Sequence, residues 1–197
     1  MKYSQENIQI TRQELMAKVQ MQMSPRRFQH VLGVEACAIE LATLYGASLE
    51  LASIAALCHD YAKERSDETF ITWINEQQLP LELLNWGNAV WHGIVGAEII
   101  KQELLVTNEA VLNAIRVHTT GAAEMSLLDK ILYVADYIEP NRDFVGVEKA
   151  RQLAYQNLDA AVAYETEQTL VHLLAKKAPI YPKTIETYNK WVAHQSY

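Results

Sequence analysis

The sequence has little of what makes extended, linker-rich or disulfide-linked structure. Its 197 residues include only 7 glycines, 5 prolines and 2 cysteines, and no low-complexity stretch, repeat or long Gly/Ser/Pro linker interrupts them. Cys37 and Cys58 both lie in apolar sequence, which predicts buried, reduced thiols. The absence of a linker favours one domain over residues 1–197, with a core over about 24–140 and further helices over about 145–197.

Positive charge is also scarce, because 17 Lys and Arg residues face 24 Asp and Glu residues and the formal net charge is -7. This balance argues against non-specific binding to nucleic acid or to anionic membranes, although an anionic small molecule needs only a local positive pocket. No apolar run approaches the ~20 residues of a membrane span. The N-terminus lacks the apolar core of a signal peptide. We therefore expect a cytoplasmic protein without a nucleic-acid or membrane partner.

Apolar residues at helical spacing are abundant, and hydrophobic residues make up 50% of the chain. No segment shows a clear alternation of period 2, so the predicted fold class is all-α, a compact helical bundle. Ser24-Pro25, Ser48, Ser66, Thr107 and Ser126 read as helix starts, and Gly46, Gly121 and Pro140 as stops. The expected helices are 25–45, 49–64, 67–78, 88–105, 108–119, 127–138, 147–156, 158–177 and 184–195.

Six polar residues stand in apolar helical surroundings on five of these helices: His30, His59, Asp60, His92, His118 and Asp136. One such residue is usually a core side chain with a satisfied hydrogen bond. Burying six of them independently would be costly, and an ionised Asp in the middle of the helix 49–64 must be paired or bind a cation. A shared metal centre in the core of the bundle satisfies all six together.

The donor types select the class of metal. Four imidazoles and two carboxylates without a thiolate suit iron, manganese, nickel, cobalt or zinc better than calcium or magnesium. Six ligands exceed the needs of one open catalytic ion. Two ions about 3.5–4 Å apart, with one bridging carboxylate, use all six and can activate a water as a nucleophile near pH 7.

The order His…His-Asp…His…His…Asp resembles the HD-domain phosphohydrolases in their dinuclear form. The flanking sequences are similar to the bacterial YqeK-like family of symmetrical bis(5'-nucleosyl)-tetraphosphatases, which split diadenosine tetraphosphate into two ADP. The segments that carry this resemblance are RRFQHVLGVEACAIELA, AALCHDYAKE, WHGIVGAE, AIRVHTTG, YVADYIEPNRDF and the late IYPKTIETYN. They span roughly residues 24 to 191.

The resemblance implies which ligands bind each of the two metals. His30, His59, Asp60 and Asp136 would hold one metal, and Asp60 would bridge to a second that is held also by His92 and His118. Iron is the metal associated with that family. Asp60 and Lys63 are the implied catalytic residues, and the C-terminal helices would complete a pocket for a dinucleoside polyphosphate.

Basic residues near the ligands are expected to bind phosphate. Lys63 follows Asp60 by one helical turn, Arg27 precedes His30 by one turn, and Arg142 lies just after Pro140. The predicted substrate contacts also include residues beside Gly121 and in a non-helical break after Pro179, where the nucleoside would lie: His118, Thr119, Thr120, Ile180, Tyr181, Pro182, Lys183 and Thr184.

Three alternatives stay open at this stage. An HD-type site can act on another nucleotide, such as a nucleoside mono- or triphosphate or a cyclic dinucleotide. A dinuclear iron site can also serve an oxygenase. The third alternative is a non-catalytic nucleotide sensor. The apolar helix faces leave a homodimer possible.

Overall fold

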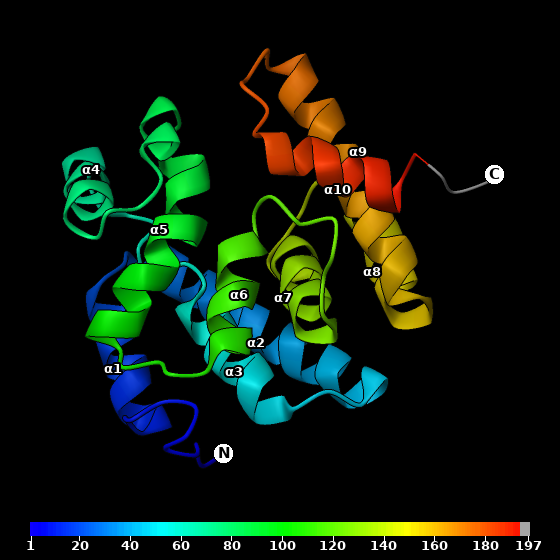
Figure 1. The fold of residues 1–197 in the computed structure, drawn as a ribbon. Helices are drawn as coiled ribbons and strands as arrows, with labels where there is room; N and C mark the ends of the chain where they lie inside the picture. Colours follow the sequence, from blue (N-terminus) through cyan, green and yellow to red (C-terminus); the bar gives the residue numbers. More distant parts are fainter. Residues whose placement is uncertain (194–197) are drawn as a thin grey trace.

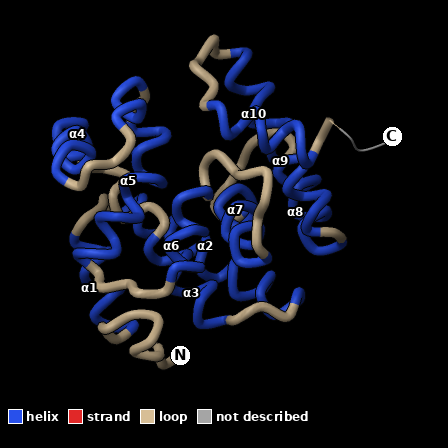
Figure 2. The backbone as a smooth tube through the Cα atoms, in the orientation of Figure 1, coloured by secondary structure: helices blue, strands red, loops and turns tan. Residues whose placement is uncertain are grey.

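The computed structural model describes residues 1–193, and over that range the fold is all-helical, as predicted (Figures 1 and 2). Ten α-helices follow one another along the chain: α1 Arg12–Met21, α2 Pro25–Tyr45, α3 Leu49–Cys58, α4 Asp67–Glu76, α5 Asn88–Glu103, α6 Glu109–Val117, α7 Leu127–Ile138, α8 Val147–Gln156, α9 Leu158–Ala175 and α10 Pro182–Trp191. A short 3₁₀ helix, η1 Leu81–Asn85, precedes α5.

Most of the predicted helix starts are confirmed by side-chain caps. The hydroxyls of Ser24, Ser48, Ser66 and Ser126 each accept a hydrogen bond from a backbone N–H in the first turn of the helix that follows. Gly46 ends α2 in the left-handed conformation, with φ 72°.

Other helix boundaries were predicted wrongly. Asn108, not Thr107, caps α6, because the Asn108 carboxamide accepts from two backbone N–H groups while the Thr107 hydroxyl donates to the Glu6 carbonyl. The helix α3 ends at Cys58 rather than at residue 64. The helix α10 begins at Pro182, two residues early, and residues 194–195 of its predicted end lie outside the described residues. The helices α1 and η1 were not predicted.

The core lies where α2, α3, α6 and α7 pack against one another (Figure 1). The helix α5 packs on α6 from one side, and α9 packs on α7 from the other. Both cysteines are buried and free, as predicted. Within residues 1–193, no helix has both the length and the apolarity to cross a membrane.

The C-terminal helix is tied to the loop that follows α6. The Thr187 hydroxyl donates to the Thr120 carbonyl at 3.0 Å, and the Trp191 indole donates to the Ala122 carbonyl at 2.9 Å. Gly121 has φ +64°, and a Cβ there would lie 2.5 Å from the Thr187 side chain. Only glycine therefore lets α10 approach this loop so closely.

The Glu165 carboxyl group, on α9, is buried and has no ionic partner within residues 1–193. It is 6% exposed, and its Oε2 has no hydrogen-bond partner among the described residues. Burial, with the nearby Asp136 charge adding to its effect, raises the pKa of Glu165 well above its usual value. The group is therefore protonated in the folded chain at a pH where the unfolded chain has lost the proton.

This difference predicts a pH-dependent gain for Glu165→Gln. Because the folded state holds the proton more tightly, folding stability falls as pH rises above the ordinary glutamate pKa, and a neutral amide removes that loss. We expect the difference in free energy of unfolding, variant minus wild type, to grow between pH 5 and pH 8 by at most about 1.4 kcal/mol per pH unit. Denaturant unfolding at several pH values measures it, and a difference that does not change with pH would contradict it.

Candidate metal centre

His59 and Asp60 stand at a helix end rather than in the middle of a helix, where they were predicted. The His59 N–H still bonds to the Ala55 carbonyl, but the following residues wind as turns with i→i+3 bonds, such as Lys63 N to Asp60 O at 2.9 Å. In this tighter winding, side chains three residues apart eclipse one another. Lys63 therefore still follows Asp60 on one face, as predicted.

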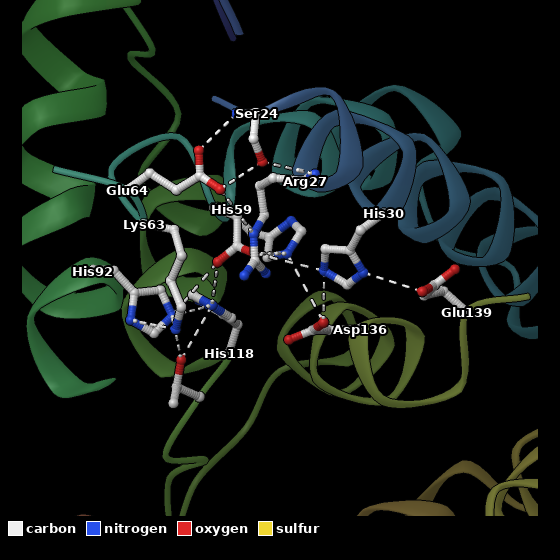
Figure 3. Close-up of polar contacts among 12 residues, drawn as sticks. Ser24, Arg27, His30, His59, Lys63, Glu64, His92, His118, Asp136 and Glu139 are labelled. Carbon is white, nitrogen blue, oxygen red and sulfur yellow. Dashed lines mark hydrogen bonds and ion pairs between the residues drawn. The ribbon is translucent and has the colours of Figure 1, made fainter. Parts of the chain in front are cut away.

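The structure brings all six predicted ligands together. Figure 3 shows the imidazoles and the Asp136 carboxylate directed toward a common centre. They come from five segments: the first half of α2, the end of α3, α5, the end of α6, and α7. All of them except Asp136 are buried. The six residues are His30, His59, Asp60, His92, His118 and Asp136. Five segments that are far apart in the sequence thus supply one cluster.

The two carboxylate oxygens of Asp60 face different histidines. Its Oδ2 lies 3.6 Å from His30 Nε2 and 3.5 Å from His59 Nε2. Its Oδ1 lies 3.6 Å from His92 Nε2 and 3.9 Å from His118 Nε2. Asp60 therefore stands between two pairs of imidazoles, the arrangement that a bridging ligand needs.

Asp136 belongs to the first of these pairs. Its Oδ1 lies 3.1 Å from His30 Nε2 and 3.9 Å from His59 Nε2. The potential ligand atoms gather in three overlapping groups, each within 4.8 Å: His30, His59 and Asp60; His59, His118 and Asp136; and Asp60, His92 and His118. The third group holds the residues predicted for the second half-site, and the first holds three of the four predicted for the other, without Asp136. The second group joins residues of both half-sites, so the two lie close together.

Every histidine of the cluster is held through its Nδ1. Three of these nitrogens lie within hydrogen-bond distance of a backbone carbonyl three or four residues earlier: His59 to Ala56 at 2.7 Å, His92 to Asn88 at 2.6 Å and His118 to Ile115 at 2.6 Å. A proton on Nδ1 leaves the Nε2 lone pair free and fixes its direction. The four Nε2 atoms are therefore presented to the cluster as ligands.

The charge states of the second half-site suit cation binding. Burial lowers the pKa of His118 to about 4, with His59 adding to the effect. Burial, Lys63 and His118 together hold the pKa of His92 well below its usual value. Although burial acts against ionisation, the His59 imidazole, whose own pKa the carboxylates of Asp60 and Asp136 raise, holds the pKa of Asp60 well below its usual value. At neutral pH the second half-site thus presents neutral imidazoles beside an ionised carboxylate.

The unpartnered atoms test whether a cation fits. His30 Nε2 and His59 Nε2 are buried and have no hydrogen-bond partner among the described residues. A buried acceptor without a donor is costly, whereas a cation between the two imidazoles and Asp60 satisfies both lone pairs. The residues present therefore fit divalent cations.

Three cationic side chains surround the ligands, as predicted. Lys63 Nζ lies 3.2 Å from both ring nitrogens of His92, and burial lowers the pKa of Lys63 against the opposing effect of the two carboxylates. Arg27 Nη1 lies 2.7 Å from Asp60 Oδ2. Arg142 Nη2 lies 2.7 Å from Asp136 Oδ1. Each guanidinium keeps further donors for a phosphate.

A polar cavity of about 710 Å³ opens beside this cluster. Its walls include Arg26, Arg27, His30 and Arg142. Arg26 was not singled out in the sequence, although it directly precedes Arg27. The cavity brings three arginines to one ligand histidine beside two carboxylates, Glu64 and Glu139, and the excess of positive charge favours an anionic ligand.

The predicted threonines differ in their positions. The Thr119 hydroxyl lies 3.0 Å from His92 Nε2 and 3.1 Å from His118 Nε2, at the second half-site. The Thr120 hydroxyl instead donates to the Gly121 carbonyl within its own loop. Thr119, and not Thr120, therefore has its hydroxyl at the second half-site.

The predicted nucleoside segment 180–184 is only partly a break between helices. Tyr181 precedes α10 and packs edge-on against Trp86, with ring centroids 4.9 Å apart, and residues 182–184 form the first turn of α10. Tyr181 and Lys183 line a cavity of about 310 Å³ that reaches Val117, the residue before His118. The segment thus shares a cavity with the residue that precedes a ligand of the second half-site, and its contact with a nucleoside stays a prediction.

Glu139 is a site residue that was missed in the sequence. Its Oε1 lies 3.2 Å from His30 Nδ1, and its Oε2 accepts from the Asn141 backbone and side chain. Gly33, one turn after His30, makes room for it, because a Cβ there would overlap Glu139 Oε2. In the sequence, a glycine one turn after a ligand histidine was the sign that another side chain packs closely against this part of α2.

Comparison with known proteins agrees with this geometry. The HD domain family matches residues 27–141, which hold all six candidate ligands, and the chain belongs to that family. A "Bis(5'-nucleosyl)-tetraphosphatase, symmetrical" of Bacillus subtilis is 43% identical over 95% of this chain and 100% of its own length. A protein of the same name from Halalkalibacterium halodurans is 44% identical over 88% of this chain and 92% of its own length. Such relatives place the chain in the symmetrical bis(5'-nucleosyl)-tetraphosphatase family and confirm the resemblance.

A solved structure is also similar. The crystal structure of a "predicted HD superfamily hydrolase involved in NAD metabolism" from Clostridium acetobutylicum matches with a TM-score of 0.87 and 34% sequence identity. It covers 93% of this chain and 97% of that chain. The likeness confirms the predicted HD-type helical fold.

The position of Glu139 predicts the effect of Gly33→Ala. The added methyl displaces Glu139, which frees the His30 ring and weakens metal binding by about 10- to 100-fold. Metal titration followed by elemental analysis measures this affinity. The control is Gly87→Ala, since nothing lies within 4 Å of a Cβ there. Equal metal affinity in the two variants would mean that Glu139 does not hold His30.

Proposed function

We propose that this chain is a metal-dependent hydrolase that cleaves diadenosine tetraphosphate, and related dinucleoside polyphosphates, symmetrically into two ADP. The observation that carries the proposal is Asp60 placed between two pairs of inward Nε2 atoms, with Lys63, Arg27 and Arg142 around it. Relatives of that name at 43–44% identity over most of the chain support the substrate.

The candidate ligands define two half-sites. We assign His30, His59, Asp60 and Asp136 to one ion, and Asp60, His92 and His118 to the other. When bound there, divalent cations supply a water activated near neutral pH and Lewis acidity toward phosphate. Iron is our proposal for the resident metal, with manganese, nickel, cobalt and zinc compatible with the same donors. Elemental analysis of the purified protein tests the identity of the metal.

The remaining residues act on the phosphate chain. Arg27, Lys63 and Arg142 neutralise charge on the phosphates, and the Thr119 hydroxyl is placed to donate a hydrogen bond to a phosphate oxygen at the second half-site. A water attacks one of the two central phosphorus atoms, and the bond from that phosphorus to the central bridging oxygen breaks. Each product keeps one adenosine and two phosphates.

The alternatives have less support. The oxygenase and sensor hypotheses find no specific observation in their favour, and three cationic side chains around the ligands suit a phosphate substrate. Homodimer formation stays a prediction.

The product distribution tests the proposal directly. Metal-loaded protein should convert diadenosine tetraphosphate to ADP as the sole nucleotide product, and chelation should abolish turnover. Chromatographic separation of the products measures both effects. Formation of AMP and ATP would contradict symmetrical cleavage, and tight binding without turnover would favour a sensor.

Lys63→Met separates substrate binding from metal binding. Removing a buried cation beside His92 takes a like charge away from the metals, so metal content should stay at the wild-type level. The phosphate contact is lost, so kcat/KM should fall about tenfold or more. Steady-state kinetics with metal analysis measures both quantities. Loss of metal with unchanged kinetics per bound metal would show that Lys63 supports the metal centre instead.

A further inference from the structure

The proposed reaction places a demand on the shape of the site, and the inference that follows rests on that proposed function. Symmetrical cleavage puts the reacting bond at the midpoint of the substrate, so one adenosine diphosphate half extends to each side of the metal centre. The predicted segment around Tyr181 shares a cavity with Val117, next to a ligand of the second half-site, and accounts for one nucleoside at most. The other adenosine needs a place on the side of His30 and Asp136.

A second cavity meets this demand. It measures about 650 Å³ and lies between α7, the loop after α7 and α9, and we call it the α7–α9 cavity. Its lining includes Asp136 and Arg142, so it adjoins the first half-site. Arg142 also lines the polar cavity of Arg26 and Arg27 and is therefore shared by both spaces. The volume is within the range of small-molecule sites, about 300–1,000 Å³.

The walls of this cavity suit an aromatic base. Tyr137 and Phe144 pack edge to face with centroids 4.9 Å apart, and both line the space. Val145 is fully exposed and Val171 is 56% exposed, so the rim presents apolar surface to solvent. Stacking of a base on aromatic side chains is a common way to bind a nucleoside.

Glu165 supplies a polar group at the wall. Its side chain lines the cavity, is almost fully buried and has an Oε2 without a hydrogen-bond partner in the described part of the chain. A protonated carboxyl offers one donor and one acceptor. Adenine presents a matching pair of groups, the N1 acceptor and the N6 amino donor.

We propose that the α7–α9 cavity binds the adenine of one half of the substrate, with Glu165 hydrogen-bonded to the base and Arg142 contacting the phosphates that lead to the metal centre. The other adenosine extends past Thr119 toward Tyr181. Recognition of both nucleosides then makes diadenosine tetraphosphate a better substrate than a tetraphosphate that carries only one.

A pair of substrates isolates the contribution of the second nucleoside. Adenosine 5'-tetraphosphate has the same four phosphates and one adenosine, and hydrolysis at its midpoint gives ADP and pyrophosphate. We define the selectivity as kcat/KM for diadenosine tetraphosphate divided by kcat/KM for adenosine 5'-tetraphosphate, measured with the metal-loaded full chain. The wild-type selectivity should exceed one by about tenfold or more, as expected for a stacked base.

Two variants close or weaken the cavity. Thr169→Trp fills it, and Phe144→Ala, in the loop after α7, removes a half-exposed stacking surface. Both should lower the selectivity, by about tenfold for the filled cavity and about fivefold for the lost ring. Glu167→Trp is the matched control, since residue 167 lies on α9 outside the lining, and its selectivity should equal that of the wild type.

Glu165 has its own pair of variants. Glu165→Gln keeps one donor and one acceptor and should retain the selectivity, whereas Glu165→Leu should lose it about tenfold. Equal loss in the Gln and Leu variants, with metal content unchanged, would remove Glu165 from the proposed contact.

The outcomes separate this inference from the proposed function. If the wild type does not release ADP from diadenosine tetraphosphate, the proposed function fails. If it does, but its selectivity is near one or is unchanged in both Thr169→Trp and Phe144→Ala, the proposed function stands and the nucleoside subsite is overturned. A loss in Phe144→Ala alone supports the subsite even if Thr169→Trp does not fold.

Discussion

The structure depends on one constraint, that four buried imidazoles must all direct Nε2 toward a single shared carboxylate. Each ring is fixed through Nδ1, three of them by a backbone carbonyl of their own segment and His30 by Glu139. This fixes which nitrogen is free before any ligand binds. The two oxygens of Asp60 then divide the four rings into pairs, so one side chain determines the geometry of both half-sites.

The helical bundle serves this constraint because its ligands sit at or near helix ends. His59 and His118 are the C-caps of α3 and α6, and the tighter turns after Cys58 bring Lys63 back over Asp60. The chain turns away after His59 and Asp60, after His118 and shortly after Asp136, whereas His30 and His92 lie in the first two turns of their helices. Arg142 connects two cavities, one polar and one largely apolar. A charged phosphate chain and an aromatic base need these two different environments.

Much of this was accessible from the sequence, for identifiable physical reasons. Serine caps, the left-handed Gly46 and helical periodicity are local signals, and they predicted most helices. The six polar residues in apolar helices were recognisable because burying them separately is costly. Contacts between distant segments were not accessible, such as the Gly33–Glu139 approach that positions His30. The α7–α9 cavity was missed for the same reason, since Glu165 reads as an ordinary helical glutamate until α9 packs on α7.

Crystallography of the metal-loaded protein, with anomalous scattering recorded at the metal absorption edge, tests the central claim most directly. We expect two peaks about 3.5–4 Å apart, one on each side of Asp60, with its Oδ1 and Oδ2 on different ions. A single peak bound by His30, His59 and Asp136, with Asp60 coordinating nothing on the side of His92 and His118, would contradict the shared carboxylate. So would ions located away from these side chains.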